Sequence, residues 1–425
     1  MKAPLYVFCG RDLIGTLHDE NGLTLKFSSA CIEGFIKNPF ENIIPAGVGV
    51  TSGQRLIAYF ENLLPEGAQR MAVEKRFAVS SIFGLLSALS GETIGTLTLS
   101  RDQSPQTGSY AKSTWKDAVR SVALNNSSDD GTRLQSNMIS GAQAKILLSV
   151  DSVDCSPLLP MNGATTTHIL KPDIIHPTVK VWSSALNEAL IMKLGDLCAL
   201  GVANTQYIDA ANACLVERFD RVVLDEGTIH CLHQTDFCQE LSFLSDRKYE
   251  KDGGPSFSQC YELVREKSSR PAVDCSRLLK WLFFNLYTGN HDSHAKNLSF
   301  LHKDGEIRLS PFYDLMCTSV YKGFTKTFAF NFGGTFSPGE VKHEHLLLLA
   351  TELKVSPSRL GALALETSEL VLNKLEDAIL TVANQCSIKE EAILTRIGNE
   401  VTTNCQKLSK RMSSTASLRT KGPGL

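Results

Sequence analysis

The stretch that decides the fold of this chain reads Gly289-Asn290-His291-Asp292-Ser293-His294-Ala295-Lys296-Asn297. Within it, a carboxylate at Asp292 and an amide at Asn297 lie five residues apart. A third oxygen-bearing side chain, Asp314, follows in Pro311-Phe312-Tyr313-Asp314. Phosphoryl transfer needs one carboxylate to orient the attacking hydroxyl, and an Asn oxygen with a second carboxylate to hold Mg²⁺. These three side chains therefore predict a site for phosphoryl transfer.

The spacing of the three groups is the one that protein kinases use. Kinases place the catalytic base and the first metal ligand as Asp-x-x-x-x-Asn, and a second metal-binding Asp follows later in the chain. Between Asn297 and Asp314 the sequence predicts a hairpin, with strands over 297–301 and 306–309 joined by a His-Lys-Asp-Gly turn.

A helix is expected immediately before this stretch. Its apolar residues recur at helical spacing, and they are Leu278, Leu279, Leu282, Phe283, Leu286 and Tyr287. Asp274 or Ser276 is the expected N-cap, and Gly289 is the expected stop, because glycine adopts the left-handed conformation most easily. The helix would then deliver Asp292 at its C-terminal exit.

Length and composition describe an ordinary globular protein. The chain has 425 residues, 43% of them hydrophobic and 21% charged, which allows two or three domains and a full-sized core. The formal net charge of −2 provides no global basic field, so contact with nucleic acid would have to be local or come through a partner. No apolar run reaches the roughly 18–20 residues of a spanning helix. The N-terminus also lacks a signal-peptide pattern, so we expect a cytoplasmic protein without membrane contact.

The twelve cysteines are scattered from Cys9 to Cys405 and form no Cys-x-x-Cys pair. Disulfide scaffolds are short and dense in cysteine, and this chain is neither. We therefore expect reduced cysteines that act mainly as small buried apolar residues.

The pattern of apolar runs and polar breaks predicts a division of the chain into five segments. They are an N-terminal subdomain of β-hairpins and helices (1–124), a polar mobile loop (125–137), the remainder of the N-terminal lobe (138–240), a helical C-terminal lobe (241–412) and a disordered tail (413–425). In the first segment we expect strands over 5–8, 13–17 and 23–27 and helices over 55–64 and 80–90. In the third we expect strands over 146–150, 167–171 and 214–219 and a helix over 184–194. Two or three further amphipathic helices are expected over 343–411.

A phosphate-binding loop is suggested by Ser140-Gly141-Ala142-Gln143-Ala144-Lys145, which precedes the strand over 146–150. Glycine lets backbone amides approach phosphates, and Lys145 adds positive charge. Taken alone, such a segment is more often a simple turn, and it is not a Walker A motif. Lys171 ends the next expected strand, where kinases carry a lysine that pairs with the nucleotide phosphates and with a helix glutamate. Glu188 is the candidate partner, and the order of these parts is more specific than any one of them.

Two residues inside the catalytic stretch have open roles. His294 could orient Asp292 or contact phosphate, or it could simply pack the loop. Lys296 could neutralise the transferring phosphoryl group or remain solvated. A zinc site at His291 and His294 is disfavoured, because no second ligand pair with the usual spacing follows, and the cluster of His230, Cys231 and His233 is equally loose.

Taken together, these residues resemble the HipA family of bacterial serine/threonine kinase toxins over nearly the whole chain. The segments that carry the resemblance are Phe60-Glu61-Asn62-Leu63-Leu64-Pro65-Glu66-Gly67, Gly141 to Lys145, Thr167 to Lys171, Val216-Glu217-Arg218-Phe219-Asp220-Arg221, Gln234 to Gln239, Lys248 to Pro255, His294 to Asn297 and Phe312 to Asp314. The resemblance implies an α+β, protein-kinase-like fold of two lobes, the N-terminal lobe containing β-strands and the C-terminal lobe mostly helical. By itself, the segment from Lys248 to Pro255 reads as a charged, glycine-rich surface connection.

The resemblance also implies a role for each site residue. Asp292 would be the catalytic base, with His294 and Lys296 beside it, and Asn297 and Asp314 would be the Mg²⁺ ligands. Contacts with the nucleotide are implied for Gly141, Ala142, Gln143, Lys145, Lys171, Thr235, Phe237 and Tyr313. The implied cofactors are ATP and Mg²⁺, with adenine bound by backbone groups of Thr235 and Phe237.

Partners and substrate are implied in the same way. Members of the family phosphorylate an aminoacyl-tRNA synthetase such as a glutamate-tRNA ligase, arrest translation and promote growth arrest or persistence. They are held by a small helix-turn-helix antitoxin dimer, through which the complex contacts DNA and represses its own operon.

One position departs from the family pattern. The best-known members carry an autophosphorylated serine three residues before the loop glycine, and here that position is Met138. Ser136 and Ser140 flank it and are the candidate autophosphorylation sites.

Two other interpretations of the sequence remain open. One is a kinase of the same fold that acts on a small molecule or a lipid. The other is a non-catalytic scaffold that only binds an antitoxin on DNA, which the presence of Lys171, Asp292, Asn297 and Asp314 disfavours.

Overall fold

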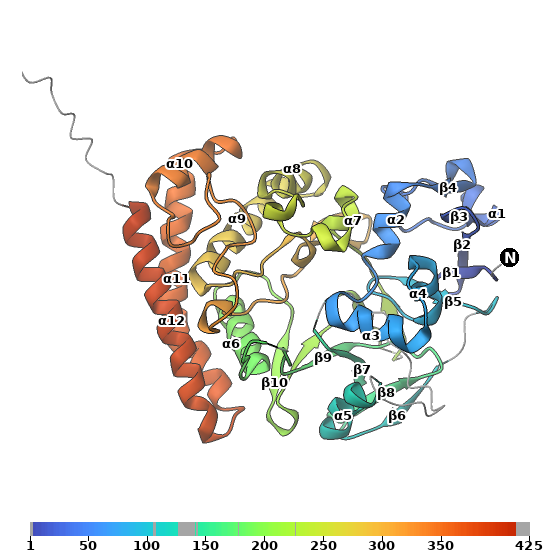
Figure 1. Cartoon of the computed structure of the whole chain (residues 1–425), viewed down its shortest axis with the longest axis horizontal. Helices are drawn as coiled ribbons and strands as arrows, with labels where there is room; N and C mark the ends of the chain where they lie inside the picture. The colour runs from blue at the N-terminus through green and yellow to red at the C-terminus, as the bar shows by residue number, and fades with distance from the viewer. Residues whose placement is uncertain are drawn as a thin grey trace, which may run out of the picture.

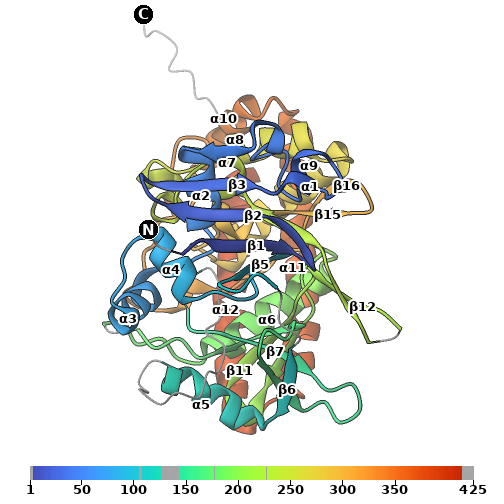
Figure 2. The ribbon, with the colours of Figure 1, turned by 90° about the vertical axis from the view of Figure 1, so that its right-hand side faces the viewer.

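A five-stranded antiparallel sheet opens the chain, with strand order β4-β3-β2-β1-β5. Figure 2 shows β3, β2, β1 and β5 in succession. The computed structural model describes residues 3–104, 108–125, 141, 143–176, 178–225 and 227–413. The strands of this sheet are β1 (Leu5–Cys9), β2 (Asp12–Asp19), β3 (Leu23–Phe27), β4 (Val50–Ser52) and β5 (Leu97–Ser100). The three strands expected from the sequence are confirmed, with somewhat longer bounds for the first two. Apolar side chains such as Leu5, Val7 and Leu25 are fully buried beneath the sheet.

Four helices accompany this sheet, and they are α1 (Ser29–Ile32), α2 (Gln54–Glu61), α3 (Gly67–Phe77) and α4 (Ile82–Ala88). Helix α2 packs Leu56, Tyr59 and Phe60 into the same core as the sheet. The helix expected over 55–64 therefore exists, but it ends at Glu61. The reason is a change to tighter turns ahead of Pro65, in which the backbone N–H of Leu64 donates to the carbonyl of Glu61 at 3.0 Å.

A second sheet has six strands in the order β10-β11-β9-β7-β8-β6, and all its neighbouring pairs are antiparallel. Its strands are β6 (Ser109–Lys112), β7 (Ile146–Val150), β8 (Pro157–Met161), β9 (His168–Pro172), β10 (Thr205–Ile208) and β11 (Ala213–Glu217). Helix α5 (Trp115–Asn125) packs against β7 and β8, and α6 (Ser184–Leu197) packs against β9, β10 and β11. The strand expected over 214–219 ends at Glu217, because the chain turns at Arg218, whose carbonyl accepts the backbone N–H of Arg221 at 3.1 Å.

Buried ion pairs join the first sheet to the second. Arg218 bonds Asp220 at 2.9 Å and lies 3.3 Å from Glu92, while Arg221 bonds Glu92 at 2.8 Å and Asp220 at 2.9 Å. The backbone N–H of Gly95 donates to Asp220 at 2.7 Å. Glu92 and Gly95 precede β5 of the first sheet, and Arg218 and Asp220 follow β11 of the second sheet. The network therefore attaches the N-terminal subdomain to the end of β11, the strand beside the one that carries Lys171.

Breaking this network is expected to be costly. We predict that Arg218→Met destabilises the fold by about 3–5 kcal/mol, because Asp220 and Glu92 would keep buried negative charge with one cation fewer. The midpoint of urea unfolding measures the effect. Arg120→Met is the matched control, since Arg120 forms a solvent-exposed pair with Asp117 and such pairs contribute little to stability. Equal midpoints for Arg218→Met and the control would contradict the prediction.

The C-terminal lobe is mostly helical (Figure 1). Its helices are α7 (Phe237–Leu241), α8 (Phe257–Lys267), α9 (Pro271–Thr288), α10 (His343–Glu352), α11 (Pro357–Ala383) and α12 (Ile388–Ser413). Two small sheets complete the fold, formed by β12 (Arg221–Val223) with β13 (Ile229–Cys231), and by β14 (His233–Asp236), β15 (Ser299–Lys303) and β16 (Glu306–Leu309). The long helices α11 and α12 lie side by side at the edge of the molecule far from the first sheet. The hairpin expected after Asn297 is confirmed, with its first strand displaced to Ser299–Lys303.

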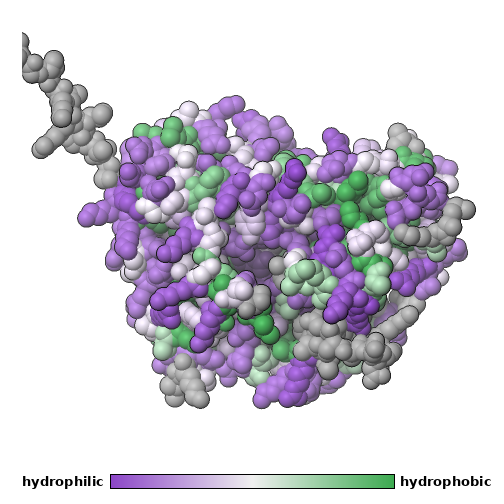
Figure 3. Space-filling model, viewed as in Figure 1, coloured by the Kyte–Doolittle hydropathy of each residue, from purple (hydrophilic) through white to green (hydrophobic). Residues whose placement is uncertain are grey.

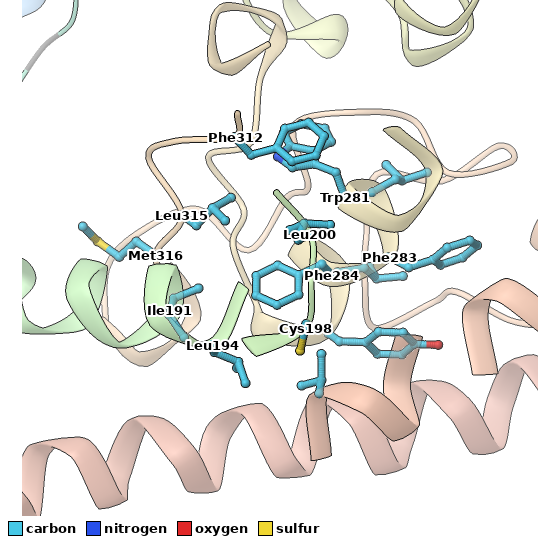
Figure 4. Close-up of a cluster of buried hydrophobic side chains, with 14 of the residues drawn as sticks. Ile191, Leu194, Cys198, Leu200, Trp281, Phe283, Phe284, Phe312, Leu315 and Met316 are labelled. Atoms are coloured by element: carbon cyan, nitrogen blue, oxygen red, sulfur yellow. The ribbon is translucent and has the colours of Figure 1, made fainter. Parts of the chain in front are cut away.

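Helix α9 is the central buried helix of this lobe. In Figure 4 its Trp281 and Phe284 lie among side chains of α6 and of the segment from Phe312 to Met316. The predicted caps Asp274 and Ser276 are wrong, because the helix starts at Pro271, whose fixed φ suits a first helical turn. Asp274 is instead fully buried and accepts hydrogen bonds from Arg308 and from the backbone N–H of Leu309, each at 3.0 Å. The stop at Gly289 is confirmed, with φ of +69°.

All twelve cysteines are free, and eight of them are buried, as expected. Across the described residues, no helix combines the length and the apolar character needed to cross a membrane. The tail expected over 413–425 and the loop expected over 125–137 fall almost entirely outside the described residues.

Candidate active site

The catalytic stretch forms a tight turn at the exit of α9. The backbone N–H of His291 donates to the hydroxyl of Thr318 at 2.8 Å, and a 3₁₀ turn, η5, covers Ala295–Asn297. The amide of Asn297 donates to the carbonyl of Asp292 at 3.0 Å. Asp292 is exposed to solvent, while the residues on either side of it are buried. The turn therefore presents the carboxylate of Asp292 outward and fixes Asn297 against its backbone.

Asp314 and Lys171 meet on the other side of the site. The ammonium of Lys171 bonds the carboxylate of Asp314 and bonds Glu188 on α6 at 2.6 Å. Lys171 and Glu188 are 4% and 1% exposed, so the Lys171–Glu188 pair expected from the sequence is confirmed and is buried. Asp314 adopts a left-handed backbone conformation, with φ of +57°, and such strain is often found at functional sites.

The charges of this cluster are held by their neighbours. Burial alone would raise the pKa of Asp314, but the ammonium groups of Lys171 and Lys145 more than offset it and hold that pKa well below its ordinary range. Burial likewise would lower the pKa of Lys171, and the carboxylates of Asp314 and Glu188 raise it above its ordinary value. Lys171 is therefore a cation and Asp314 an anion at any physiological pH.

The segment expected to bind phosphate lies beside this cluster. Gly141 has φ of +111°, a backbone conformation that favours glycine, and a Cβ at this position would lie 2.7 Å from the ammonium of Lys145. Burial lowers the pKa of Lys145 to about 8. The side-chain amide of Gln143 donates to the carbonyl of Pro172 at 3.0 Å. Ala142, Met138 and the candidate autophosphorylation sites Ser136 and Ser140 lie outside the described residues.

His294 and Lys296 point into protein. Burial holds the pKa of His294 well below its ordinary value, so its ring is neutral, and it packs edge-on against Tyr249. The ammonium of Lys296 bonds the side-chain and backbone oxygens of Asn62 at 2.8 and 3.1 Å and lies 3.2 Å from Glu66. Asn62 and Glu66 come from the N-terminal subdomain, and a third partner, Asp236, lies 3.8 Å from the ammonium. The arrangement favours a role for Lys296 in holding the catalytic turn.

The residues expected to contact adenine lie where the lobes connect. Thr235 is in β14, opposite Phe300 of β15. The backbone N–H of Phe237 donates to the carbonyl of Leu298 at 3.0 Å, and its ring packs against Phe300, so that N–H is already engaged. The hydroxyl of Tyr313 donates to the carbonyl of Lys296 at 2.7 Å, which attaches Tyr313 to the catalytic turn.

Sequence reasoning missed Tyr249, whose hydroxyl donates to the carboxylate of Asp292. Tyr249 lies in the segment from Lys248 to Pro255, which reads as a surface connection until the structure brings it to the site. The signal in the sequence was that this segment is one of those that carry the resemblance to the HipA family. Although Asp292 is exposed, the protein around its carboxylate removes part of its hydration and raises its pKa, while Lys248 and Tyr249 act in the opposite direction.

Removing the hydroxyl of Tyr249 is expected to change the pH dependence of the reaction. In Tyr249→Phe, Asp292 loses a hydrogen bond that favours its ionised form, so its pKa rises further. If Asp292 is the base, as the sequence predicts, it must be ionised to work, so the acid limb of the profile of kcat/KM against pH should move to higher pH. Tyr207→Phe, which removes a hydroxyl that bonds Glu390 instead, is the control. An acid limb at the same pH in both variants would show that Tyr249 does not influence the base.

The hydrophilic hollow near the centre of the face shown in Figure 3 lies where Figure 1 draws α6, α9 and β9. Helix α6 carries Glu188, α9 leads into the catalytic turn, and β9 carries Lys171. Lys171 and Glu188 thus lie beside Asp314, whose carbonyl is 3.4 Å from the side-chain amide of Asn290 in the turn at the exit of α9.

Comparison with known families decides the relationship. Residues 137–382 match the model described as the HipA-like C-terminal domain, and residues 5–100 match the one described as the HipA N-terminal domain. The first match alone covers more than half of the chain. This chain belongs to the HipA family. It is accordingly a serine/threonine-protein kinase of the kinase-like, two-lobed α+β fold.

Individual relatives agree with the membership in the HipA family. The chain is 33% identical over 371 residues to a Sinorhizobium fredii protein named "Putative kinase Y4mE", covering 83% of this chain and 86% of the relative. It is 27% identical over 328 residues to the serine/threonine-protein kinase toxin HipA of Shewanella oneidensis, covering 71% of this chain and 72% of that protein. Among solved structures, the Shewanella oneidensis complex of HipA, HipB and operator DNA contains a chain with the same fold. The TM-score is 0.81 at 21% identity, with 96% of this chain and 99% of that chain covered.

The donor set of this HipA-family site suits Mg²⁺. Asn297 donates to the carbonyl of Asp292 through its NH₂ group, which leaves its oxygen at the opposite end, and Asp314 is an ionised carboxylate. Hard oxygen ligands of this kind, with one or two carboxylates, are those that Mg²⁺ takes together with substrate phosphates. Among the described residues, no cluster of three or more His, Cys, Asp or Glu side chains could hold a metal, which gives no support to a zinc site.

Proposed function

We propose that this HipA-family kinase transfers the γ-phosphoryl group of ATP to a serine or threonine of a protein, with Mg²⁺ as cofactor, and acts as the toxin of a toxin–antitoxin pair. The observation that carries the proposal is the convergence of Asp292, Asn297, Asp314 and the buried Lys171–Glu188 pair in one site. A scaffold without activity would have no need of a buried lysine held between two carboxylates, since such a cluster costs desolvation energy.

In the proposed mechanism, Asp292 orients the acceptor hydroxyl and receives its proton. A bond forms between the acceptor oxygen and the γ-phosphorus as the bond to the bridging oxygen breaks, and ADP leaves. Lys171 and Lys145 contribute positive charge to the phosphates, and Lys296 holds the catalytic turn. A divalent cation held by Asn297 and Asp314 would, when bound, offset negative charge on the transferred group.

The position of Tyr249 adds a requirement to this mechanism. Its hydroxyl occupies one oxygen of the Asp292 carboxylate, so the acceptor hydroxyl must use the other oxygen or displace Tyr249. Adenine recognition is assigned to backbone groups of Thr235 and Phe237, although the N–H of Phe237 already donates to the carbonyl of Leu298. Tyr313 is assigned a place beside the nucleotide, where it also supports the turn.

We assign the substrate and partner by family membership. The proposed substrate is an aminoacyl-tRNA synthetase, such as a glutamate-tRNA ligase, in the cytoplasm, and its phosphorylation would arrest translation. The proposed partner is a HipB-like helix-turn-helix antitoxin dimer, which the similarity to a HipA found with HipB and operator DNA supports. Contact with DNA would run through that antitoxin, because this chain has a net charge of −2. Ser140 or Ser136 is proposed as the site of autophosphorylation.

Incubation with radiolabelled ATP tests the function directly. Label should appear in protein from a cell extract when Mg²⁺ is present and should vanish with a chelator, and phosphopeptide mapping should locate it on an aminoacyl-tRNA synthetase. Label confined to metabolites or lipids would contradict a protein substrate. Thermal unfolding with Mg²⁺ and nucleotide at 100-fold its dissociation constant should show about 2.7 kcal/mol of stabilisation. The absence of both stabilisation and transfer would leave only the scaffold.

A further inference from the structure

Glu66 lies deep in the site, although it belongs to the N-terminal subdomain. It is 8% exposed and stands at the end of the segment Asn62-Leu63-Leu64-Pro65-Glu66, which connects α2 to α3. In Figure 1, α2 lies beside α7 of the C-terminal lobe, and this contact carries the segment to the catalytic turn. A buried carboxylate requires partners, and those of Glu66 all belong to the kinase lobes.

Three parts of the active site meet at Glu66. Its carboxylate bonds the ammonium of Lys248 at 2.7 Å through one oxygen and lies 3.2 Å from the ammonium of Lys296 through the other. Its backbone N–H donates to the carbonyl of Gly141 at 3.1 Å, and Pro65 and Gly141 form a parallel β-bridge. One residue therefore touches the phosphate-binding loop, the catalytic turn and the loop that follows α7.

Each residue that Glu66 contacts lies next to a group that the proposed reaction uses. Lys296 lies between Asp292 and Asn297 in the turn, and Lys248 precedes Tyr249, whose hydroxyl bonds Asp292. The backbone N–H of Ala295 also donates to the carbonyl of Lys248 at 3.4 Å, which ties the two loops together. Gly141 lies beside Lys145.

The charge state agrees with this placement. Burial would raise the pKa of Glu66, but Lys296 and Lys248 outweigh it and lower the pKa to about 2. Glu66 is therefore ionised at neutral pH, and it provides the negative charge that two buried or half-buried ammonium groups need.

We propose that Glu66 is a positioning residue through which the N-terminal subdomain holds the phosphate-binding loop and the catalytic base at the separation needed for transfer. The inference rests on the proposed ATP-dependent reaction and extends it. The N-terminal subdomain is then a component of the active site, and it acts through side-chain charge on the turn and through the backbone on the phosphate-binding loop.

Glu66→Gln separates these two actions. The variant keeps the backbone N–H that bonds Gly141, so the nucleotide dissociation constant should stay within about twofold of wild type. It removes the charge that holds Lys248 and Lys296, so kcat should fall by about 10- to 100-fold, as expected for a small misplacement of reacting groups. Glu66→Asp restores the charge on a shorter side chain and should recover part of kcat.

Glu61→Gln is the matched control. Glu61 is a buried carboxylate of the same subdomain that bonds Ser245 and Arg70 but does not touch the catalytic turn. This variant should lower the melting temperature and leave kcat within about twofold. A kcat of Glu66→Gln equal to wild type, or equal losses of kcat in both variants, would overturn the inference.

Lys248→Met provides a second route if Glu66→Gln does not fold. Its loss of kcat should be smaller than that of Glu66→Gln, because Lys296 remains paired with Glu66, and nucleotide affinity should again be retained. A Lys248→Met variant with unchanged kcat would overturn the coupling as well. Failure of the wild-type chain to transfer phosphate would instead refute the proposed function, so the two failures are distinguishable.

Discussion

Asp292→Asn is expected to lower the rate of phosphoryl transfer by about 10²- to 10⁴-fold, the usual contribution of a general base. Asparagine has the same shape and can still accept the hydrogen bond from Tyr249. It cannot receive the proton of the acceptor hydroxyl. The loss should therefore appear in kcat, while the nucleotide dissociation constant stays near that of wild type. Single-turnover transfer from radiolabelled ATP and a separate nucleotide titration measure the two quantities.

The control for this substitution is Asp304→Asn. Asp304 is an exposed carboxylate in the turn between β15 and β16, close in sequence to the site, and asparagine tolerates its positive φ. Its rate should remain within about twofold of wild type. If Asp292→Asn retained the wild-type rate as well, another group would have to accept the proton.

Lys171→Met is expected to affect both stability and catalysis. The substitution leaves the buried carboxylate of Glu188 and the partly exposed carboxylate of Asp314 without their shared cation. Breaking a buried ion pair in this way costs about 3–5 kcal/mol. Nucleotide affinity should fall by about tenfold or more, because one charge-assisted contact to the phosphates is lost. Urea unfolding at neutral pH and nucleotide titration measure these changes.

The effect of acid provides a sharper test of the same variant. In wild type, the pKa of Asp314 is below its ordinary value, so the stability that it contributes is present above that ordinary value and is lost as the pH falls. In Lys171→Met the pKa of Asp314 would rise, and the pKa of Glu188, which burial already raises in wild type, would rise further. Acidification from pH 7 toward 5 should therefore narrow the stability gap between variant and wild type. A gap that stays constant over this range would contradict the proposed charge arrangement.

Lys193→Met is the control for both measurements. Lys193 lies on α6, the helix that carries Glu188, and forms a largely exposed pair with Asp196. Such a pair contributes about 0–1 kcal/mol, and its removal should not change the response to acid.

Much of the site could be predicted because its parts are close together in the sequence. Asp292 and Asn297 lie on one turn, and the hydrogen bond between them is set by five residues of chain. The helix before the turn and the hairpin after it follow from apolar periodicity and from Gly289, which are local properties. The pairing of Lys171 with Glu188 was predictable as well, because a strand and the helix after it often pack together.

Errors in prediction occurred where a distant residue changed the use of a local one. Asp274 is of a residue type that often caps helices. Its buried carboxylate instead pairs with Arg308 on β16, and the helix starts three residues earlier, at Pro271. The backbone N–H of Phe237 is likewise engaged by the carbonyl of Leu298, and the adenine contact expected from backbone groups of Thr235 and Phe237 stays a prediction. The domain boundaries and the nucleotide contacts stay predictions, as do the roles assigned to the individual site residues.

The sequence by itself determined the catalytic turn, the strand lysine with its helix glutamate, and the secondary structure that carries them. The tertiary structure alone decided that Tyr249 bonds Asp292 and that Asn62 and Glu66 surround Lys296 from more than 200 positions away in the chain. The physical reason is that periodicity, caps and turns depend on neighbours within a few residues. A buried charge, in contrast, selects its partners by distance in space, and any complementary side chain that the packed core brings within about 3 Å will serve.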